Sequence, residues 1–335
     1  MHNKTCFVMH DLLNDLAKYV SGEICYRLGI DRRGNVPKTT RHFLTIKNPV
    51  ECDEYRSLCD AKRLRTFMSK SKDFGMSIQE LISNFKFLRL LSLSDCCNIK
   101  EVPDTINDLI HLRSLDLSLT GIVRLPDSIC SIYNLQVLKL NYCAYLEELP
   151  SNLHELTKLC RLELKGTTLR KVPKLLGKLK NLQVWMGGFE VGKSSSELSI
   201  QQLRQLDLHG HLSIKNLEDI VNSCDALAAD LKNKTYLVDL YLQWNFKRNN
   251  YESIKEREVL ENLHPSRNLE QLSIFNYYGT QFPHWLSDKF LLNMVSLNLY
   301  NCKYYQWLPS FGLLTFLKEL KISGLHGIVR IDADF

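Results

Sequence analysis

The sequence predicts an α/β solenoid of stacked leucine-rich repeats, a curved structure with short parallel strands along its concave face. The main observation is an apolar pattern that returns every 23 or 24 residues. Each copy reads Leu-x-x-Leu-x-Leu-x-x-Cys/Thr, followed by an apolar residue and an apolar–Pro pair, and copies begin at Leu88, Leu112, Leu135 and Leu159. One unit cannot bury its own apolar stripe, so neighbouring units have to stack.

The turn after each strand provides a second observation. Where this position is Cys96 or Cys143, the next apolar residue follows three positions later and the repeat has 24 residues. Where it is Thr120 or Thr167, the apolar residue follows two positions later and the repeat has 23 residues. The change in length is confined to one loop, which preserves the strand register that keeps the leucines inside. We expect these small side chains to point inward.

The other elements follow in chain order. Met9, Leu12, Leu13, Leu16, Ala17 and Val20 share one face at helical spacing, so a short helical segment is expected before the solenoid. A loop at 31–40 precedes imperfect strands at 43–46 and 64–68, and later helices are expected near 219–232 and 254–263. The expected regions are 1–30, 31–84 with irregular first repeats or a linker, 85–186 with regular repeats, 187–265 with irregular repeats and helical insertions, and 266–335 with further repeats.

Composition restricts the functional class. The formal net charge of +6 over 335 residues is too mild to predict a nucleic-acid-binding protein. The chain has no apolar run long enough to span a membrane and no signal-peptide layout at its start, which favours the cytoplasm. Its 11 cysteines contain no CxxC pair, which favours buried thiols over disulfides or a metal site. The last repeat reaches Phe335 without a polar closing repeat, so we expect the chain to be truncated at both ends.

The residues also carry a family resemblance. The segment 7–17, FVMHDLLNDLA, resembles the methionine-histidine-aspartate (MHD) motif of plant intracellular nucleotide-binding leucine-rich-repeat disease-resistance proteins of the coiled-coil class. Segments 40–43, 64–67, 182–218, 259–269 and 282–286 are similar to the same family. The resemblance implies that 1–30 is the end of the nucleotide-binding region. It further implies that the repeats form the pathogen-recognition and autoinhibitory part of an immune receptor, which acts in defence by protein–protein interaction.

The resemblance also bears on cofactors. In relatives, the histidine that matches His10 contacts bound ADP and helps to hold the inactive state. The present chain lacks the phosphate-binding domain that such a contact needs, so we expect no cofactor here and ADP or ATP only in full-length relatives. The expected partners are a pathogen effector or a guarded host protein, with a possible contact to a nucleotide-binding core in cis or in trans.

Two surfaces are candidate partner-binding sites. Side chains alternate across a strand, which places one set of strand residues on the concave face. In the later repeats this face gains aromatic residues, and exposed aromatic rings are favoured at protein interfaces; the candidates are Tyr241, Trp244, Phe275 and Tyr300. The second surface is a run of basic residues that contains Lys171, Lys174 and Lys178. It could meet an acidic surface of a nucleotide-binding core, although most charge runs are simply solvated.

Two other functional classes are considered. Gly187–Ser194 satisfies the phosphate-binding pattern G-x-x-x-x-G-K-[ST], in which Lys193 would contact a nucleotide. The strand before it continues a solenoid and no strand–helix units follow, which favours a structural loop. A secreted leucine-rich-repeat inhibitor or receptor is disfavoured because no signal peptide is visible. His209 and His211 lack further ligands at metal spacing. We therefore predict that the chain is not an enzyme.

Overall fold

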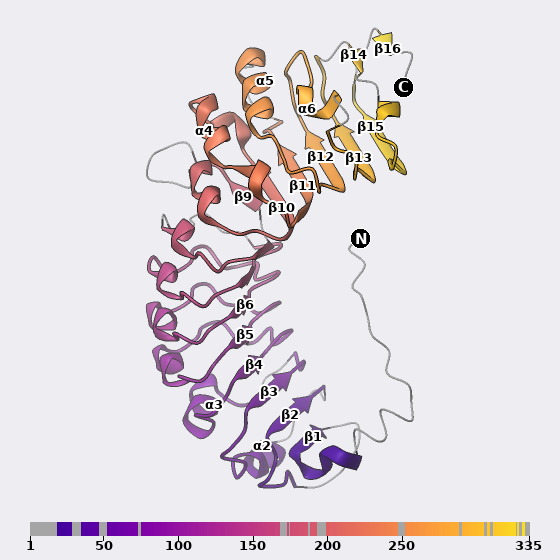
Figure 1. The fold of residues 1–335 in the computed structure, drawn as a ribbon. Helices are drawn as coiled ribbons and strands as arrows, with labels where there is room; N and C mark the ends of the chain where they lie inside the picture. The colour runs from indigo at the N-terminus through magenta and orange to yellow at the C-terminus, as the bar shows by residue number, and fades with distance from the viewer. Residues whose placement is uncertain are drawn as a thin grey trace.

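The structure is a computed structural model of residues 1–335. It describes residues 19–28, 35–46, 52–72, 75–167, 173, 175–186, 188–192, 199–246, 252–287, 290–304, 307–308, 311–325, 327 and 330–331. The chain forms a curved solenoid with strands on its concave side and helical turns on its convex side (Figure 1). The predicted leucine-rich-repeat solenoid is therefore confirmed. The helical segment expected before it, from Met9 to Val20, lies outside the described residues except for its last two positions.

Parallel strands form two sheets that follow the order of the chain. The first contains β1 (Cys25–Leu28), β2 (His42–Thr45), β3 (Thr66–Ser69), β4 (Leu90–Ser92), β5 (Ser114–Asp116), β6 (Val137–Lys139), β7 (Arg161–Glu163) and β8 (Val184–Met186). The second contains β9 (Gly188–Glu190), β10 (Gly210–Lys215), β11 (Leu237–Gln243), β12 (Gln271–Phe275), β13 (Ser296–Tyr300) and β15 (Glu319–Ser323). A separate pair joins β14 (Trp307–Leu308) to β16 (Arg330–Ile331).

Short helices cover the convex side. In the regular repeats a 3-10 helix follows each apolar–Pro pair, because proline fixes a backbone angle that suits the start of a helical turn; these are η2 (Asp104–Asp108), η3 (Asp127–Ser131), η4 (Leu153–Glu155) and η5 (Leu176–Lys178). The others are η1 (Gly22–Ile24), α2 (Cys52–Leu58), α3 (Ile78–Asn84), η6 (Ile200–Gln205), η7 (Leu217–Asp219), α4 (Ser223–Ala228), η8 (Leu231–Asn233), α5 (Ser253–Asn262), α6 (His284–Ser287) and η9 (Phe311–Leu313). Helices α4, η8 and α5 confirm the helical segments expected near 219–232 and 254–263.

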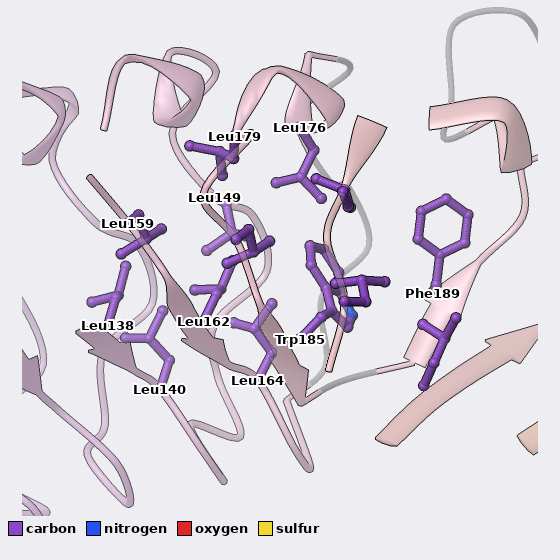
Figure 2. Packing of buried hydrophobic residues seen from close by; sticks show 14 of the residues in the cluster. Leu138, Leu140, Leu149, Leu159, Leu162, Leu164, Leu176, Leu179, Trp185 and Phe189 are labelled. Carbon is purple, nitrogen blue, oxygen red and sulfur yellow. The ribbon is translucent and has the colours of Figure 1, made fainter. Parts of the chain in front are cut away.

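The core is a column of buried side chains, one from each strand of the first sheet. The strand register aligns Tyr26, Phe43, Phe67, Leu91, Leu115, Leu138, Leu162 and Trp185. Leu138 and Leu162 are 0 % exposed, and Figure 2 shows them packed between neighbouring repeats. Burying one leucine contributes about 1.5–3 kcal/mol, so the stacked column holds the solenoid together.

The turn residues point inward, as predicted. Cys96, Cys143, Cys302 and Thr120 are buried, and Thr167 is half-buried. Thr120 Oγ1 donates a hydrogen bond of 2.7 Å to the Leu117 carbonyl. Burial raises the pKa of Cys96 to about 11 and that of Cys302 to about 12, which keeps both thiols uncharged at neutral pH. None of the described helices combines the length and the apolar character needed to cross a bilayer.

Candidate protein-binding surface

The concave face presents side chains in columns that run across neighbouring strands. The parallel register aligns Ser92, Asp116, Lys139 and Glu163 in the first sheet, and Tyr241, Ser273, Asn298 and Lys321 in the second. It also aligns Gln243, Phe275, Tyr300 and Ser323. Each step along a column is about 4.8 Å, the usual spacing of paired strands. The columns expected from the repeat pattern are thus present.

Three aromatic rings from successive strands contact one another on the concave face of the second sheet, the first pair stacked and the second pair tilted. The ring centroids of Tyr241 and Phe275 are 4.7 Å apart, and those of Phe275 and Tyr300 are 5.4 Å apart. Tyr241 and Phe275 are half-buried, and Tyr300 is 50 % exposed. We call these three residues the aromatic row. Because they stand on a hydrogen-bonded sheet, their positions are fixed before any partner arrives.

The prediction that Trp244 belongs to this surface is wrong. Trp244 is 0 % exposed and packs in the core, where its ring centroid lies 5.2 Å from that of Tyr277. The reason is strand alternation itself: Leu240 and Leu242 of β11 face the core, and Trp244 continues this inward set one residue past the end of the strand at Gln243. Tyr277 and Tyr278, the second and third residues after the end of β12, are also buried.

The surroundings of the aromatic row are polar but largely uncharged. The Tyr241 hydroxyl lies 3.3 Å from Gln243 Oε1, and burial raises the pKa of Tyr241, so the hydroxyl stays neutral. Asn298 Nδ2 donates a hydrogen bond of 3.1 Å to Ser273 Oγ. Charged residues at the two ends of the sheet are paired: Glu190 with Lys215 at 3.3 Å, and Glu319 with Lys321 at 2.6 Å.

The concave face of the first sheet carries charge instead. Glu163 is 6 % exposed, and its carboxylate lies 3.4 Å from Arg161 Nη1 and 3.6 Å from Lys139 Nζ. Asn141 Nδ2 donates a further hydrogen bond of 2.6 Å to the same carboxylate. The carboxylate therefore neutralises cations of its own strand and of the neighbouring strand, and this network fixes the surface between β6 and β7.

A row of four arginines borders β2–β5, and the leucine pattern did not predict it. Arg41, Arg65, Arg89 and Arg113 recur every 24 residues, just before or at the start of each strand. The backbone N–H of Arg65 donates to the Arg41 carbonyl at 2.7 Å, Arg89 to Arg65 at 2.7 Å, and Arg113 to Arg89 at 2.8 Å. These bonds hold the four residues side by side. We call them the arginine row.

Within the described residues, no ion pair compensates the charges of the arginine row. The strands β2, β3 and β4 contain no acidic residue. The pKa of His42 is lowered by burial and further by the positive charges of Arg65 and Arg41. The recurrence of arginine at a fixed repeat position was the sequence signal that could have revealed the row.

The remaining candidate residues do not gather at a site. Lys178 is exposed at the end of η5 on the convex side, while Lys171, Lys174 and His10 lie outside the described residues. A metal centre is not found either: among the residues described, no three potential ligands of the His, Cys, Asp and Glu types meet. His211 Nδ1 instead lies 2.8 Å from Asp239 Oδ2.

The phosphate-binding pattern at Gly187–Ser194 does not form a phosphate loop in its described part. Residues Gly188–Glu190 are the strand β9, which pairs in parallel with β10, and Phe189 is buried in the core. A phosphate loop needs exposed backbone amides that lead into a helix. Gly187, Lys193 and Ser194 themselves are outside the described residues.

Comparison with known proteins shows what the chain is similar to. A family profile described as R13L1/DRL21 LRRs matches residues 200–325. The chain is 43% identical over 99% of its length to the putative disease resistance RPP13-like protein 1 of Arabidopsis thaliana. It is 36% identical over 95% of its length to the putative disease resistance protein RGA1 of Solanum bulbocastanum. The chain belongs to this family of plant disease-resistance proteins. It spans 33% and 30% of the lengths of these two relatives.

Solved structures agree on the fold. The plant peptide hormone receptor RGFR1 in complex with RGF2 superposes with a TM-score of 0.55 at 18% identity, covering 89% of this chain and 49% of that chain. An internalin, InlF of Listeria monocytogenes, superposes with a TM-score of 0.56 at 17% identity, covering 83% and 78% respectively. At this level of identity the likeness shows a shared leucine-rich-repeat solenoid.

Proposed function

We propose that this repeat region is the recognition and autoinhibitory part of a plant immune receptor, and that it acts in the cytoplasm by binding proteins and not by catalysis. The observation that carries the proposal is the aromatic row, Tyr241, Phe275 and Tyr300, because three adjoining rings stand partly open to solvent on a rigid sheet. Aromatic side chains offer large contact areas and lose little conformational entropy on binding. The partner is a pathogen effector or a host protein under its guard.

A second contact involves the arginine row. The guanidinium groups of the arginine row come from neighbouring backbone segments about 4.8 Å apart and form no ion pair within the described chain. They match a surface rich in carboxylates, because each guanidinium can bind a carboxylate through two parallel hydrogen bonds. We propose that this row contacts an acidic surface of a nucleotide-binding core, in cis or in trans. We also propose that His10 contacts ADP in a longer protein that contains the nucleotide-binding region.

Proximity labelling in plant leaf cells tests the recognition function. The chain is fused to a biotin ligase and compared with a variant that carries Tyr241→Ala, Phe275→Ala and Tyr300→Ala. We expect at least one labelled protein to disappear with this variant, since truncating interface aromatic residues weakens binding by about 2 kcal/mol or more each.

The matched control replaces three exposed tyrosines elsewhere, Tyr133, Tyr145 and Tyr236, which are 67%, 67% and 61% exposed. This variant should label the same proteins as the wild type. Thermal melts of both purified variants check that each remains folded. Identical labelling by all three proteins would show that the aromatic row does not bind the partner, and the proposal would then be withdrawn.

A further inference from the structure

A lysine lies among aromatic rings at the rim of the second sheet. Lys303 Nζ is 5.3 Å from the ring centroid of Phe246 and 5.7 Å from that of Tyr278. Tyr304 packs edge-on against Tyr278, with ring centroids 5.4 Å apart. Phe246, Tyr278 and Lys303 each follow the last residue of their strands, β11, β12 and β13, by three positions. We call these four residues the rim cluster.

Among the residues that the structure describes, no carboxylate matches the positive charge of Lys303. Lys215 and Lys321 on the neighbouring concave face each pair with a glutamate. No described carboxylate forms an ion pair with Lys303, whose ammonium instead lies near the two ring faces. The negative faces of aromatic rings attract a cation only modestly at an exposed position. The ammonium therefore keeps most of its capacity to bind an anion.

The rim cluster adjoins the aromatic row. Lys303 follows Tyr300, the last ring of that row, after a turn that contains the buried Asn301 and Cys302. Three rings across these two groups are open to solvent: Phe246 is 56 % exposed, Tyr300 50 % and Tyr304 49 %. A partner bound to the aromatic row thus meets an apolar surface with one unneutralised cation at its edge.

We propose that the rim cluster binds a protein partner at a point where a carboxylate stands beside an apolar or aromatic side chain. The carboxylate pairs with Lys303, and the apolar group packs on Phe246 and Tyr304. This inference rests on the proposed function and deepens it by stating the chemistry of the bound segment. A cation from the partner would meet like charge here. A purely apolar segment would bury the ammonium without a counter-ion, which is unfavourable.

A charge-swap experiment tests this pairing. The probes are two fluorescently labelled synthetic peptides, one that alternates Leu and Phe with Glu and Asp, and one with Lys and Arg in place of the acids. Anisotropy titrations with the full chain compare the wild type with Lys303→Glu and Lys303→Met. We expect Lys303→Glu to weaken binding of the acidic peptide about tenfold and to strengthen binding of the basic peptide. Lys303→Met keeps the length of the side chain on the rings and should weaken the acidic peptide less.

The aromatic-row triple-alanine variant is titrated with the same peptides, which separates the two proposals. If that variant loses affinity while the Lys303 series does not discriminate between the peptides, the aromatic row stands and the rim pairing is wrong. If only the Lys303 series responds, the rim pairing stands and the aromatic row is not the contact. If neither peptide binds the wild type, the rim pairing is rejected, whereas the recognition function is still decided by proximity labelling.

Discussion

Leu138→Ala is expected to lower the free energy of unfolding by about 3–4 kcal/mol, because it leaves a cavity in a core that cannot collapse around it. Leu138 is 0 % exposed on β6 and is in register with Leu115 and Leu162 of the neighbouring strands. In a solenoid each repeat is stabilised mainly by its neighbours, so the loss weakens both interfaces of one repeat. Urea unfolding followed by circular dichroism measures the change.

The control for this substitution is Leu227→Ala, the same chemical change in a side chain of α4 that is 62 % exposed. It should alter the free energy of unfolding by no more than about 0.5–1 kcal/mol, since an exposed leucine loses little contact. Equal effects of the two substitutions would contradict the stacked-leucine core.

Reversing two charges in the arginine row is expected to abolish binding to acidic protein surfaces. In the variant that carries Arg65→Glu and Arg89→Glu, two unpaired cations become anions beside Arg41 and Arg113. We expect at least about a hundredfold loss of affinity for a labelled polyglutamate probe at low salt, because each like-charge contact replaces an attractive one. The wild-type affinity should also fall between low salt and about 0.15 M salt, where exposed charges are screened beyond roughly 8 Å.

Arg204→Glu together with Arg257→Glu is the control for net charge. Both arginines are exposed on helical segments of the convex side, η6 and α5. This variant changes the total charge by the same amount and should bind the probe with an affinity within about threefold of the wild type. If the two double variants lose affinity equally, binding depends on net charge alone and the arginine row has no special role.

The repeat pattern predicted most of the fold because it controls burial directly. Leucines at fixed spacing define which side of each strand faces the core, so the columns that contain Asp116 and Tyr241 could be assigned from the spacing of the leucines alone. The strand β1, Cys25–Leu28, was not expected, since its segment lacks the leucine pattern of the later repeats.

The binding surface was less predictable because its features depend on contacts between repeats. Trp244 was misplaced because it belongs to the inward-facing set of Leu240 and Leu242, and not to the outward-facing set of Tyr241. The position of Lys303 over Phe246 joins residues from two repeats that are not adjacent in the sequence, and no local pattern encodes it. The arginine row is visible as a recurrence of 24 residues, but the stronger leucine pattern beside it has the same period and masks it.

Hydrogen–deuterium exchange of the whole chain, measured alone and in complex with a partner, tests the central claim most directly. The partner is a protein that the wild type labels and the aromatic-row variant does not label. The claim is that the concave face and its rim form the recognition surface. It predicts slower exchange in residues 237–243, 271–275 and 296–304 on binding, with little change on the convex side. Protection confined to the convex helices α4 and α5 would contradict it.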